Sequence, residues 1–255
     1  MKFYTVKHMF WQIRVLTFYT IVSFIITAIF IIFCAPIKIF SLSYNFRYRF
    51  SVIFSYIFIY LMWIICGIKF KITGLEKLPK DGKPFLVLSN HQSFWENFFM
   101  QLIIPKHLWV IKQELFDIPF FGWCLKLLDP IAVDRNNNNS ITQILEEGEK
   151  KLKQGLSIII FPEGTRVKVE RNVNFKPSAA KLALISNTPI ILIAHNAGIV
   201  WPKGFWFKKS GIINVSIVEY MSSEYVSHFN DARSLTSYIQ EKINKEKNHL
   251  KDIGV

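Results

Sequence analysis

Hydrophobic and polar positions divide the chain into two parts with different patterns. Residues 15–37 carry no charged side chain, and a second uncharged stretch covers residues 51–68. The first run is long enough to cross a hydrocarbon core of about 30 Å, and the second is near the lower limit. The first is also longer than the apolar part of a usual signal peptide, with no clear small-residue cleavage site after it. The pattern predicts two membrane-anchoring helices within residues 1–68.

Basic residues flank both uncharged stretches on both sides, among them Arg14, Lys38, Arg49 and Lys69. The excess of positive charge that marks the cytoplasmic side of a membrane protein therefore favours neither orientation. Two geometries remain open, a hairpin that spans the bilayer and a pair of helices sunk into one leaflet. Both place the N-terminus and the domain that follows on the same side.

From residue 69 onward, short apolar runs alternate with amphipathic segments. We expect strands at residues 69–73, 85–89, 108–111, 131–133, 156–161, 190–194 and 212–217. We expect helices after residue 93 and at residues 120–127, 140–154, 178–185 and 231–250. This alternation predicts one α/β domain over residues 69–255, with a mixed, largely parallel sheet covered by helices. In such sheets the functional groups gather at the carboxyl ends of the strands.

One histidine and one carboxylate follow the expected strand at residues 85–89. His91 and Glu96 are five positions apart, so they do not share a helix face and can meet only if His91 lies in the loop and Glu96 in the first helical turn. A carboxylate that holds one imidazole nitrogen leaves the other free to act as a general base. The alternative is that Ser93 and Glu96 form a capping box and only close the helix start.

A second polar segment, residues 161–166, follows the expected strand at residues 156–161. Gly164 permits a sharp turn with exposed backbone N–H groups, while Thr165 and Arg166 supply further donors. The guanidinium fork binds phosphate at two points. The segment is typical of an anion-binding turn, and the alternative is a surface turn with a solvated arginine.

Two further polar residues stand at strand ends. Arg135 follows Asp134 after the expected strand at residues 131–133, where a structural ion pair between the two is the favoured interpretation. His195 directly follows the expected strand at residues 190–194, and a hydrogen-bonded structural histidine is favoured over a catalytic one.

Composition narrows the class of partner. The chain has 31 lysines and arginines against 18 aspartates and glutamates, a net charge of +13, together with 51% hydrophobic residues. A net positive charge of this size indicates that the binding partner is a nucleic acid or an anionic membrane surface, and the high hydrophobic content favours the membrane. Three cysteines without paired spacing support neither a disulfide framework nor a metal site.

Aromatic and lysine side chains occur together in the segment 201–209. We expect this segment to contact the membrane interface, unless its aromatic side chains pack on the core.

These segments together resemble the 1-acylglycerol-3-phosphate acyltransferase family, the membrane enzymes that make phosphatidic acid. Asn90–Glu96 matches the family's His-x-x-x-x-Asp block, and Phe161–Arg166 matches its phosphate-site block. The VDR at residues 133–135 and the segment 188–198 stand where its second and fourth blocks belong, so the resemblance covers about residues 74–198. One departure is that Glu96 stands where most members carry aspartate.

The resemblance implies roles for these residues. His91 would be the general base that deprotonates the free hydroxyl of lysophosphatidic acid, and Glu96 would orient it. The glycerol-phosphate end would be held by Glu163, Gly164, Thr165 and Arg166, with Arg135 assisting. The hydroxyl would attack the thioester of acyl-CoA or acyl-carrier protein directly, so the resemblance implies neither a metal nor a cofactor.

Two alternatives stay open at this point. One is an acyltransferase of the same fold that acts on another lysophospholipid, an ornithine lipid or glycerol phosphate. The other is a non-catalytic, membrane-anchored basic protein that binds nucleic acid or anionic lipid. We expect the enzyme at a bacterial inner membrane, with its catalytic domain on the cytoplasmic side and no nucleic-acid partner.

Overall fold

Two apolar helices open the chain in the computed structural model, which describes residues 2–29, 42–134, 140–204 and 208–253. They are α1 (Lys2–Ile29) and α3 (Tyr44–Cys66). By length and composition, Met9–Ala28 and all of α3 are able to cross a membrane. The expectation of two N-terminal apolar helices is therefore confirmed, although residues 30–37 of the first predicted run lie outside the described residues.

The rest of the chain alternates strands with helices. The strands are β1 (Ile68–Thr73), β2 (Leu86–Ser89), β3 (His107–Lys112), β4 (Ile131–Val133), β5 (Ser157–Ile160), β6 (Ile190–His195) and β7 (Gly211–Met221). The helices are η2 (Leu75–Lys77), α4 (Trp95–Ile103), η3 (Gln113–Asp117), α5 (Phe121–Lys126), α6 (Ser140–Lys153), α7 (Ser178–Ser186), α8 (Ala197–Val200), α9 (Ser223–Ser227) and α10 (Ala232–Asp252).

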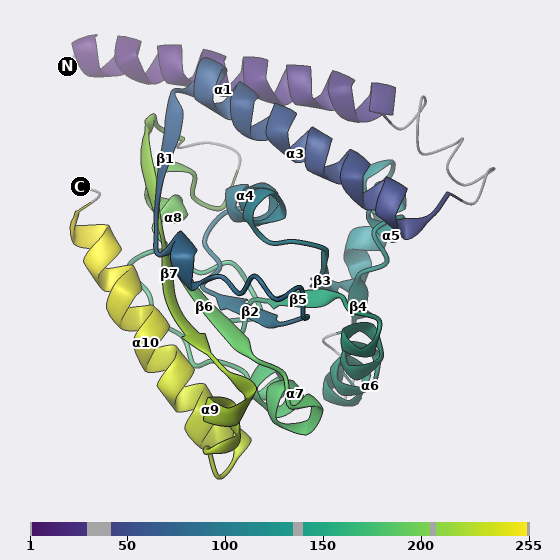
Figure 1. The fold of residues 1–255 in the computed structure, drawn as a ribbon. Coiled ribbons are helices and arrows are strands. Elements are labelled where there is room, and N and C mark those ends of the chain that lie inside the picture. The colour runs from purple at the N-terminus through teal and green to yellow at the C-terminus, as the bar shows by residue number, and fades with distance from the viewer. Residues whose placement is uncertain (1, 30–41, 135–139, 205–207, 254–255) are drawn as a thin grey trace.

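The seven strands form one sheet in the order β1-β7-β6-β2-β5-β3-β4. β6 and β7 pair antiparallel, and all other neighbouring strands pair parallel. Helices cover both faces, with α1, α3 and α4 on one side and α6, α7 and α10 on the other (Figure 1). The predicted α/β class with a mixed, largely parallel sheet is confirmed.

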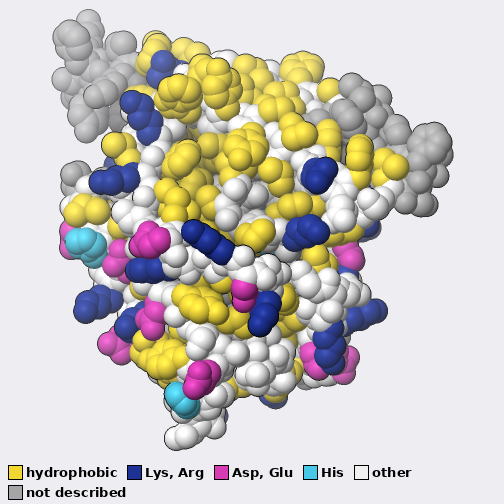
Figure 2. Space-filling view, viewed as in Figure 1, with side chains coloured by type: hydrophobic (Ala, Val, Ile, Leu, Met, Phe, Trp, Pro, Cys, Tyr) yellow, Lys and Arg dark blue, Asp and Glu magenta, His cyan; other side chains and the backbone are white. Residues whose placement is uncertain are grey.

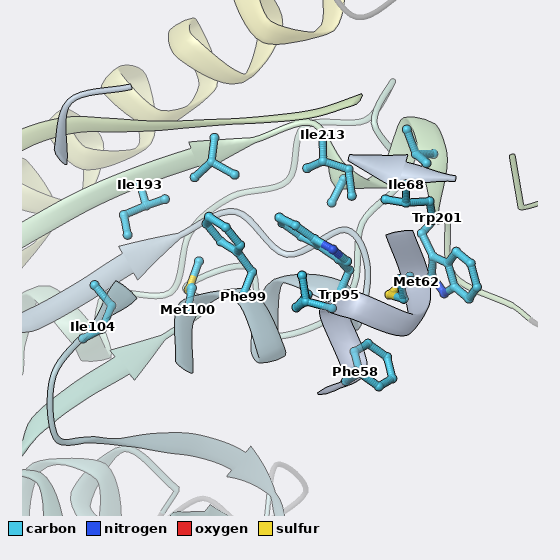
Figure 3. Packing of buried hydrophobic residues seen from close by; sticks show 14 of the residues in the cluster. Phe58, Met62, Ile68, Trp95, Phe99, Met100, Ile104, Ile193, Trp201 and Ile213 are labelled. Carbon is cyan, nitrogen blue, oxygen red and sulfur yellow. The ribbon is translucent and has the colours of Figure 1, made fainter. Parts of the chain in front are cut away.

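Strand residues alternate between two hydrophobic cores, as expected for a sheet that is covered on both faces. In β2, Val87 belongs to the core under α3 and α4, whereas Leu86 and Leu88 belong to the core under α7 and α10. Figure 3 shows the first core, in which Trp95 and Phe99 of α4 lie between the sheet and α3. Both cores position the loops at the carboxyl ends of the central strands.

The two N-terminal helices are part of the first core. Phe18 of α1 is fully buried and packs edge-on against Phe58 of α3 and against Trp201. Because the helices and the sheet share this core, the division of the chain into residues 1–68 and 69–255 stays a prediction.

The opposite faces of α1 and α3 are exposed and apolar. Hydrophobic side chains gather over these helices in Figure 2, whereas charged side chains concentrate on the domain below. The exposed residues are Met9, Phe10, Ile13, Leu16 and Phe24 of α1, and Phe46, Ile53, Tyr56, Ile57, Tyr60, Trp63 and Ile64 of α3. An exposed apolar surface of this kind is typical of membrane contact, so the two N-terminal helices indicate association with a membrane.

The predicted membrane contact at residues 201–209 is wrong for two of its side chains. Trp201 is fully buried between Phe18 and Phe94. Lys208 is buried and donates hydrogen bonds to the carbonyls of Pro202 and Gly204, so it is drawn inward rather than toward lipid headgroups. Residues 205–207 of this segment lie outside the described residues.

Candidate active site

The sheet brings three loops together at the carboxyl ends of its central strands. β2 lies between β5 and β6, and both neighbours run parallel to it. The loop after β2 carries His91, the loop after β5 carries Phe161–Arg166, and β6 ends at His195. The segments identified from the sequence therefore meet at one edge of the sheet, as expected for a parallel arrangement.

His91 and Glu96 form a hydrogen-bonded pair. The distance from His91 Nδ1 to Glu96 Oε1 is 2.8 Å. The same carboxylate oxygen accepts the backbone N–H groups of Gln92 at 2.9 Å and Ser93 at 2.8 Å. Gln92 and Ser93 precede α4, and the helix has no side-chain cap hydrogen bond at its N-cap residue Phe94. Of the expected capping box only the bond from the Ser93 N–H to Glu96 is present, because Ser93 Oγ accepts from the Trp95 N–H instead. One oxygen atom of Glu96 therefore holds both the imidazole and the backbone of the loop before α4.

The Glu96 side chain is completely buried. Burial by itself raises the pKa of its carboxyl group, but the imidazoles of His195 and His91 and the Ser93 N–H bring that pKa below its usual range. We attribute the net lowering to His91 and the backbone donor, because burial also lowers the pKa of His195 and leaves its ring neutral. The carboxylate is thus ionised at neutral pH and able to stabilise a protonated His91.

The loop after β5 holds His91 from the other side. The Phe161 ring stacks on the imidazole, with 4.1 Å between ring centroids and 11° between planes. The backbone N–H of His91 donates to Glu163 Oε2 at 2.8 Å, and the backbone N–H of Val167 donates to His91 O at 2.7 Å. These contacts fix both the ring and the backbone of His91, whose side chain stays 17% exposed.

The exposed edge of His91 lines a cavity of about 1000 Å³. This volume is at the upper end of the range for small-molecule sites. Side chains of α1 and α3, among them Val22, Phe54 and Phe58, form apolar walls, and Thr165 and Arg166 line the same cavity. One end of the cavity is therefore hydrophobic, under α1 and α3, and the other end is polar, beside the candidate catalytic pair.

The segment Phe161–Arg166 forms a turn in which the Gly164 N–H donates to Phe161 O at 3.0 Å. Gly164 has a φ of +69°, and a Cβ atom there would lie 3.1 Å from Lys176 Cε. Thr165 is exposed and Arg166 is half-buried. Such a turn with an arginine at its end is suited to an anion, although the binding roles of these residues stay a prediction.

Among the site residues predicted from the sequence, Glu163 has a buried side chain and Arg135 lies outside the described residues. Glu163 is only 7% exposed, and burial raises the pKa of its carboxyl group to about 7. Its Oε2 atom accepts from the His91 backbone, a contact that no local sequence pattern indicates. Arg135 lies outside the described residues, so its assisting role also stays a prediction.

His195 has the geometry of a structural histidine. Its Nε2–H group donates to Asn90 O at 2.8 Å, and the Ala197 N–H donates to its Nδ1 atom at 3.3 Å. The Asn90 side chain donates to His195 O at 2.9 Å and accepts the His195 N–H at 3.0 Å. This reciprocal pair joins the ends of β2 and β6 and so supports the loop that carries His91.

Known proteins share both the sequence and the fold. A model of the Acyltransferase family matches residues 69–196. A 1-acyl-sn-glycerol-3-phosphate acyltransferase of Pseudomonas aeruginosa is 39% identical over 193 residues, which cover 75% of this chain and 73% of that protein. The Helicobacter pylori protein of the same name is 35% identical over 136 residues, covering 50% of this chain and 57% of that protein.

The fold is also that of a solved structure. The crystal structure of the 1-acyl-sn-glycerophosphate (LPA) acyltransferase PlsC from Thermotoga maritima superimposes with a TM-score of 0.73 over 97% of both chains, at 21% sequence identity. That likeness concerns the fold, whereas the family model and the Pseudomonas protein match the sequence itself. From these matches, the chain belongs to the 1-acyl-sn-glycerol-3-phosphate acyltransferase family.

Proposed function

We propose that the protein is a 1-acylglycerol-3-phosphate O-acyltransferase, which transfers a fatty acyl group from a thioester to lysophosphatidic acid and gives phosphatidic acid. The observation that carries this proposal is the His91–Glu96 pair, hydrogen-bonded at 2.8 Å, beside a cavity that Arg166 also lines. The family membership supports the same reaction.

His91 acts as the general base. Its Nδ1–H group donates to Glu96, so its Nε2 atom accepts the proton of the acceptor's free hydroxyl. The hydroxyl oxygen attacks the thioester carbonyl, and the resulting tetrahedral intermediate collapses as the carbon–sulfur bond breaks. The leaving thiolate takes the proton from the imidazolium, so the products are phosphatidic acid and a free thiol. Glu96 stabilises the imidazolium between these two steps.

The phosphate group of the acceptor binds at the turn Gly164–Arg166. The Arg166 guanidinium supplies charge and a two-point fork, and Arg135 assists. The carboxylate of Glu163 repels a phosphate and already accepts from His91. We therefore place Glu163 behind the binding turn, as a support for it, rather than in contact with the anion.

Arg166→Ala is expected to raise the KM for lysophosphatidic acid about 10- to 100-fold, because a charge-assisted contact contributes about 1.5–3 kcal/mol. Arg166→Lys should recover only part of this loss, since an ammonium group lacks the fork. Steady-state kinetics with each substrate varied in turn measure the effect, and Lys168→Ala, at an exposed cation two positions away, is the control. A change in the KM of the donor alone would contradict the assignment.

Acceptor profiling separates this function from its alternatives. Thiol release is followed with purified protein, with acyl-CoA and acyl-carrier protein as donors in parallel. Lysophosphatidic acid should support release, whereas a monoacylglycerol of the same chain, which lacks the phosphate, should not. Equal rates with the two acceptors would favour an acyltransferase with another acceptor, and an absence of release with every acceptor would favour a non-catalytic binding protein.

We also propose that α1 and α3 lie within one leaflet of a bacterial inner membrane, with the domain on the cytoplasmic side. Their inner faces pack along the domain through Val15, Phe18, Phe58 and Met62. Helices that crossed the bilayer upright would pull the charged domain surface into hydrocarbon, at a cost of about 2.5–3.5 kcal/mol for each central charge. An orientation along the membrane buries the exposed apolar face without that cost.

Labelling from one side of a sealed vesicle tests this orientation. In a protein whose native cysteines are replaced, Ser43→Cys reports the connection between α1 and α3, and Lys245→Cys reports the exposed face of α10. A membrane-impermeant maleimide should label both positions from the same side. Labelling from opposite sides would favour a hairpin that spans the bilayer.

A further inference from the structure

An exposed apolar segment lies where η3 leads into α5. Residues 118–125 carry no charged side chain, and we call residues 118–123 the η3–α5 tip. Phe120 and Trp123 of this tip are 41% and 48% exposed. Their rings contact each other edge-on, with 5.5 Å between the centroids. Large apolar side chains that gather at a surface indicate a contact site, so the tip is a candidate for one.

The backbone of the η3–α5 tip is held in place. Three backbone hydrogen bonds of 2.7–3.0 Å close the turn within residues 118–124. A Cβ atom at Gly122 would lie 2.3 Å from Phe116 O, so glycine is needed for this close approach of α5 to η3. Phe120 has a φ of +61°, a left-handed conformation that is unfavourable for a bulky residue and persists where the surrounding structure fixes it. The fold therefore holds both rings at the surface.

The other side of the same segment borders the candidate active site. Phe121, Cys124 and Leu125 line the cavity, whereas Phe120 and Trp123 lie outside its lining. The exposed surfaces of these two rings therefore face away from the cavity. The segment is thus a wall with the cavity on one side and the molecular surface on the other.

The N-terminal half of α3 has the same arrangement. Phe50 and Phe54 line the cavity, while Phe46 and Ile53 are exposed. α5 lies beside the N-terminal end of α3 (Figure 1), and both elements border one cavity. The apolar surface of the η3–α5 tip therefore continues the exposed face of α1 and α3, which indicates association with a membrane. This continuity identifies the occupant of the tip as the same lipid bilayer.

We propose that the η3–α5 tip is a second membrane contact, at which Phe120 and Trp123 enter the interface of the leaflet that holds α1 and α3. Aromatic rings at the depth of the lipid headgroups are typical of such an interface. The cavity then meets the leaflet between α3 and α5, and the acceptor lipid enters there without passing through water. The entry route rests on the proposed function, whereas the membrane contact does not.

Quenching by lipid tests the membrane contact. In a full-length protein whose native cysteines are replaced, Trp123→Cys, Phe24→Cys and Ile185→Cys each carry the same fluorophore. Phe24 is exposed on α1, and Ile185 is exposed on α7, on the other side of the sheet. In vesicles of phosphatidylethanolamine and phosphatidylglycerol, nitroxide-labelled lipid should quench positions 24 and 123 and leave position 185 unquenched.

The absence of quenching at position 123 would overturn the contact, and position 24 then shows whether the orientation proposed for α1 fails with it. A response of position 123 to acyl-carrier protein without quenching by lipid would assign the η3–α5 tip to a protein partner instead.

A polar tip tests the entry route. Phe120→Asn combined with Trp123→Gln removes both rings, and asparagine tolerates the left-handed backbone at residue 120, so this variant should fold. Thiol release with long-chain lysophosphatidic acid in vesicles should fall severalfold, whereas release with a short-chain, water-soluble lysophosphatidic acid should be unchanged. Ile185→Gln, at an exposed apolar residue away from the tip, is the control and should alter neither rate.

Wild-type rates with both acceptors, or an equal fall with both, would overturn the entry route. If the wild-type protein releases no thiol with any acceptor, the proposed function fails. The quenching measurement needs no turnover, so it decides the membrane contact in either case.

Discussion

His91→Ala is expected to lower kcat by about 10²- to 10⁴-fold, the range that a positioned general base contributes. The imidazole is held at Nδ1 by Glu96, at its face by Phe161 and through its backbone N–H by Glu163. All three contacts present one nitrogen atom to the cavity that Arg166 lines. His195 does not offer a replacement base, because it is buried and its Nε2–H group donates to Asn90 O.

The measurement is thiol release at saturating lysophosphatidic acid, together with the thermal unfolding midpoint and vesicle binding. His91 is partly exposed and outside both hydrophobic cores, so the variant should fold and associate with membranes like the wild type. His228→Ala, at an exposed histidine near the end of α9, is the matched control. Wild-type turnover in a folded His91→Ala protein would remove His91 from the mechanism.

Much of the fold could be predicted because its pattern is local. β2 and β6 are continuous apolar runs that are buried on both faces, as parallel strands inside a covered sheet require. The final helix shows Leu235, Ile239 and Ile243 at spacings of four, and all three are buried. The short helices α8 and α9 were not predicted, because segments of four and five residues do not develop a helical period.

In the candidate site, contacts could be predicted from the sequence only where the residues are close together in the chain. The pairing of His91 with Glu96 follows from a strand, a loop and a helix start that are contiguous in sequence, and the structure confirms that pairing. The bond between Asn90 and His195 joins residues 105 positions apart, and the bond from Lys247 to Arg171 spans 76 positions. These contacts depend on strand order and helix packing, which no short segment specifies.

Trp201 and Lys247 show why composition misleads at single positions. A tryptophan beside lysines is equally typical of a membrane interface and of a loop that closes over a core. Trp201 lies in the core rather than at a membrane interface because Phe18 of α1, which is distant in sequence, packs against it. Lys247 stands among charged residues in a C-terminal helix and has the local pattern of a solvated face. Only the path of residues 171–175 across that helix makes it a buried cation.

Glu96→Gln is expected to lower kcat by about 10²-fold or more while leaving the unfolding midpoint nearly unchanged. The Glu96 Oε1 atom accepts from His91, Gln92 and Ser93, and a carbonyl oxygen at the same place can keep these three contacts. The Oε2 atom has no hydrogen-bond partner among the described residues, so an amide nitrogen there breaks no bond. What disappears is the negative charge that stabilises the imidazolium after proton transfer.

The comparison with Glu96→Asp completes this test. Aspartate keeps the charge but is shorter by one methylene, so the carboxylate reaches either the imidazole or the backbone donors of Gln92 and Ser93 less well. If charge is the essential property, Glu96→Asp should retain more of kcat than Glu96→Gln, even though it is the variant with the larger loss of stability. The opposite order, with Glu96→Gln as active as the wild type, would mean that Glu96 only holds the backbone of the loop before α4. Because one oxygen holds both the loop before α4 and the imidazole, the two measurements must be made on the same preparations. We expect kcat to depend on the negative charge and the unfolding midpoint to depend on the hydrogen bonds.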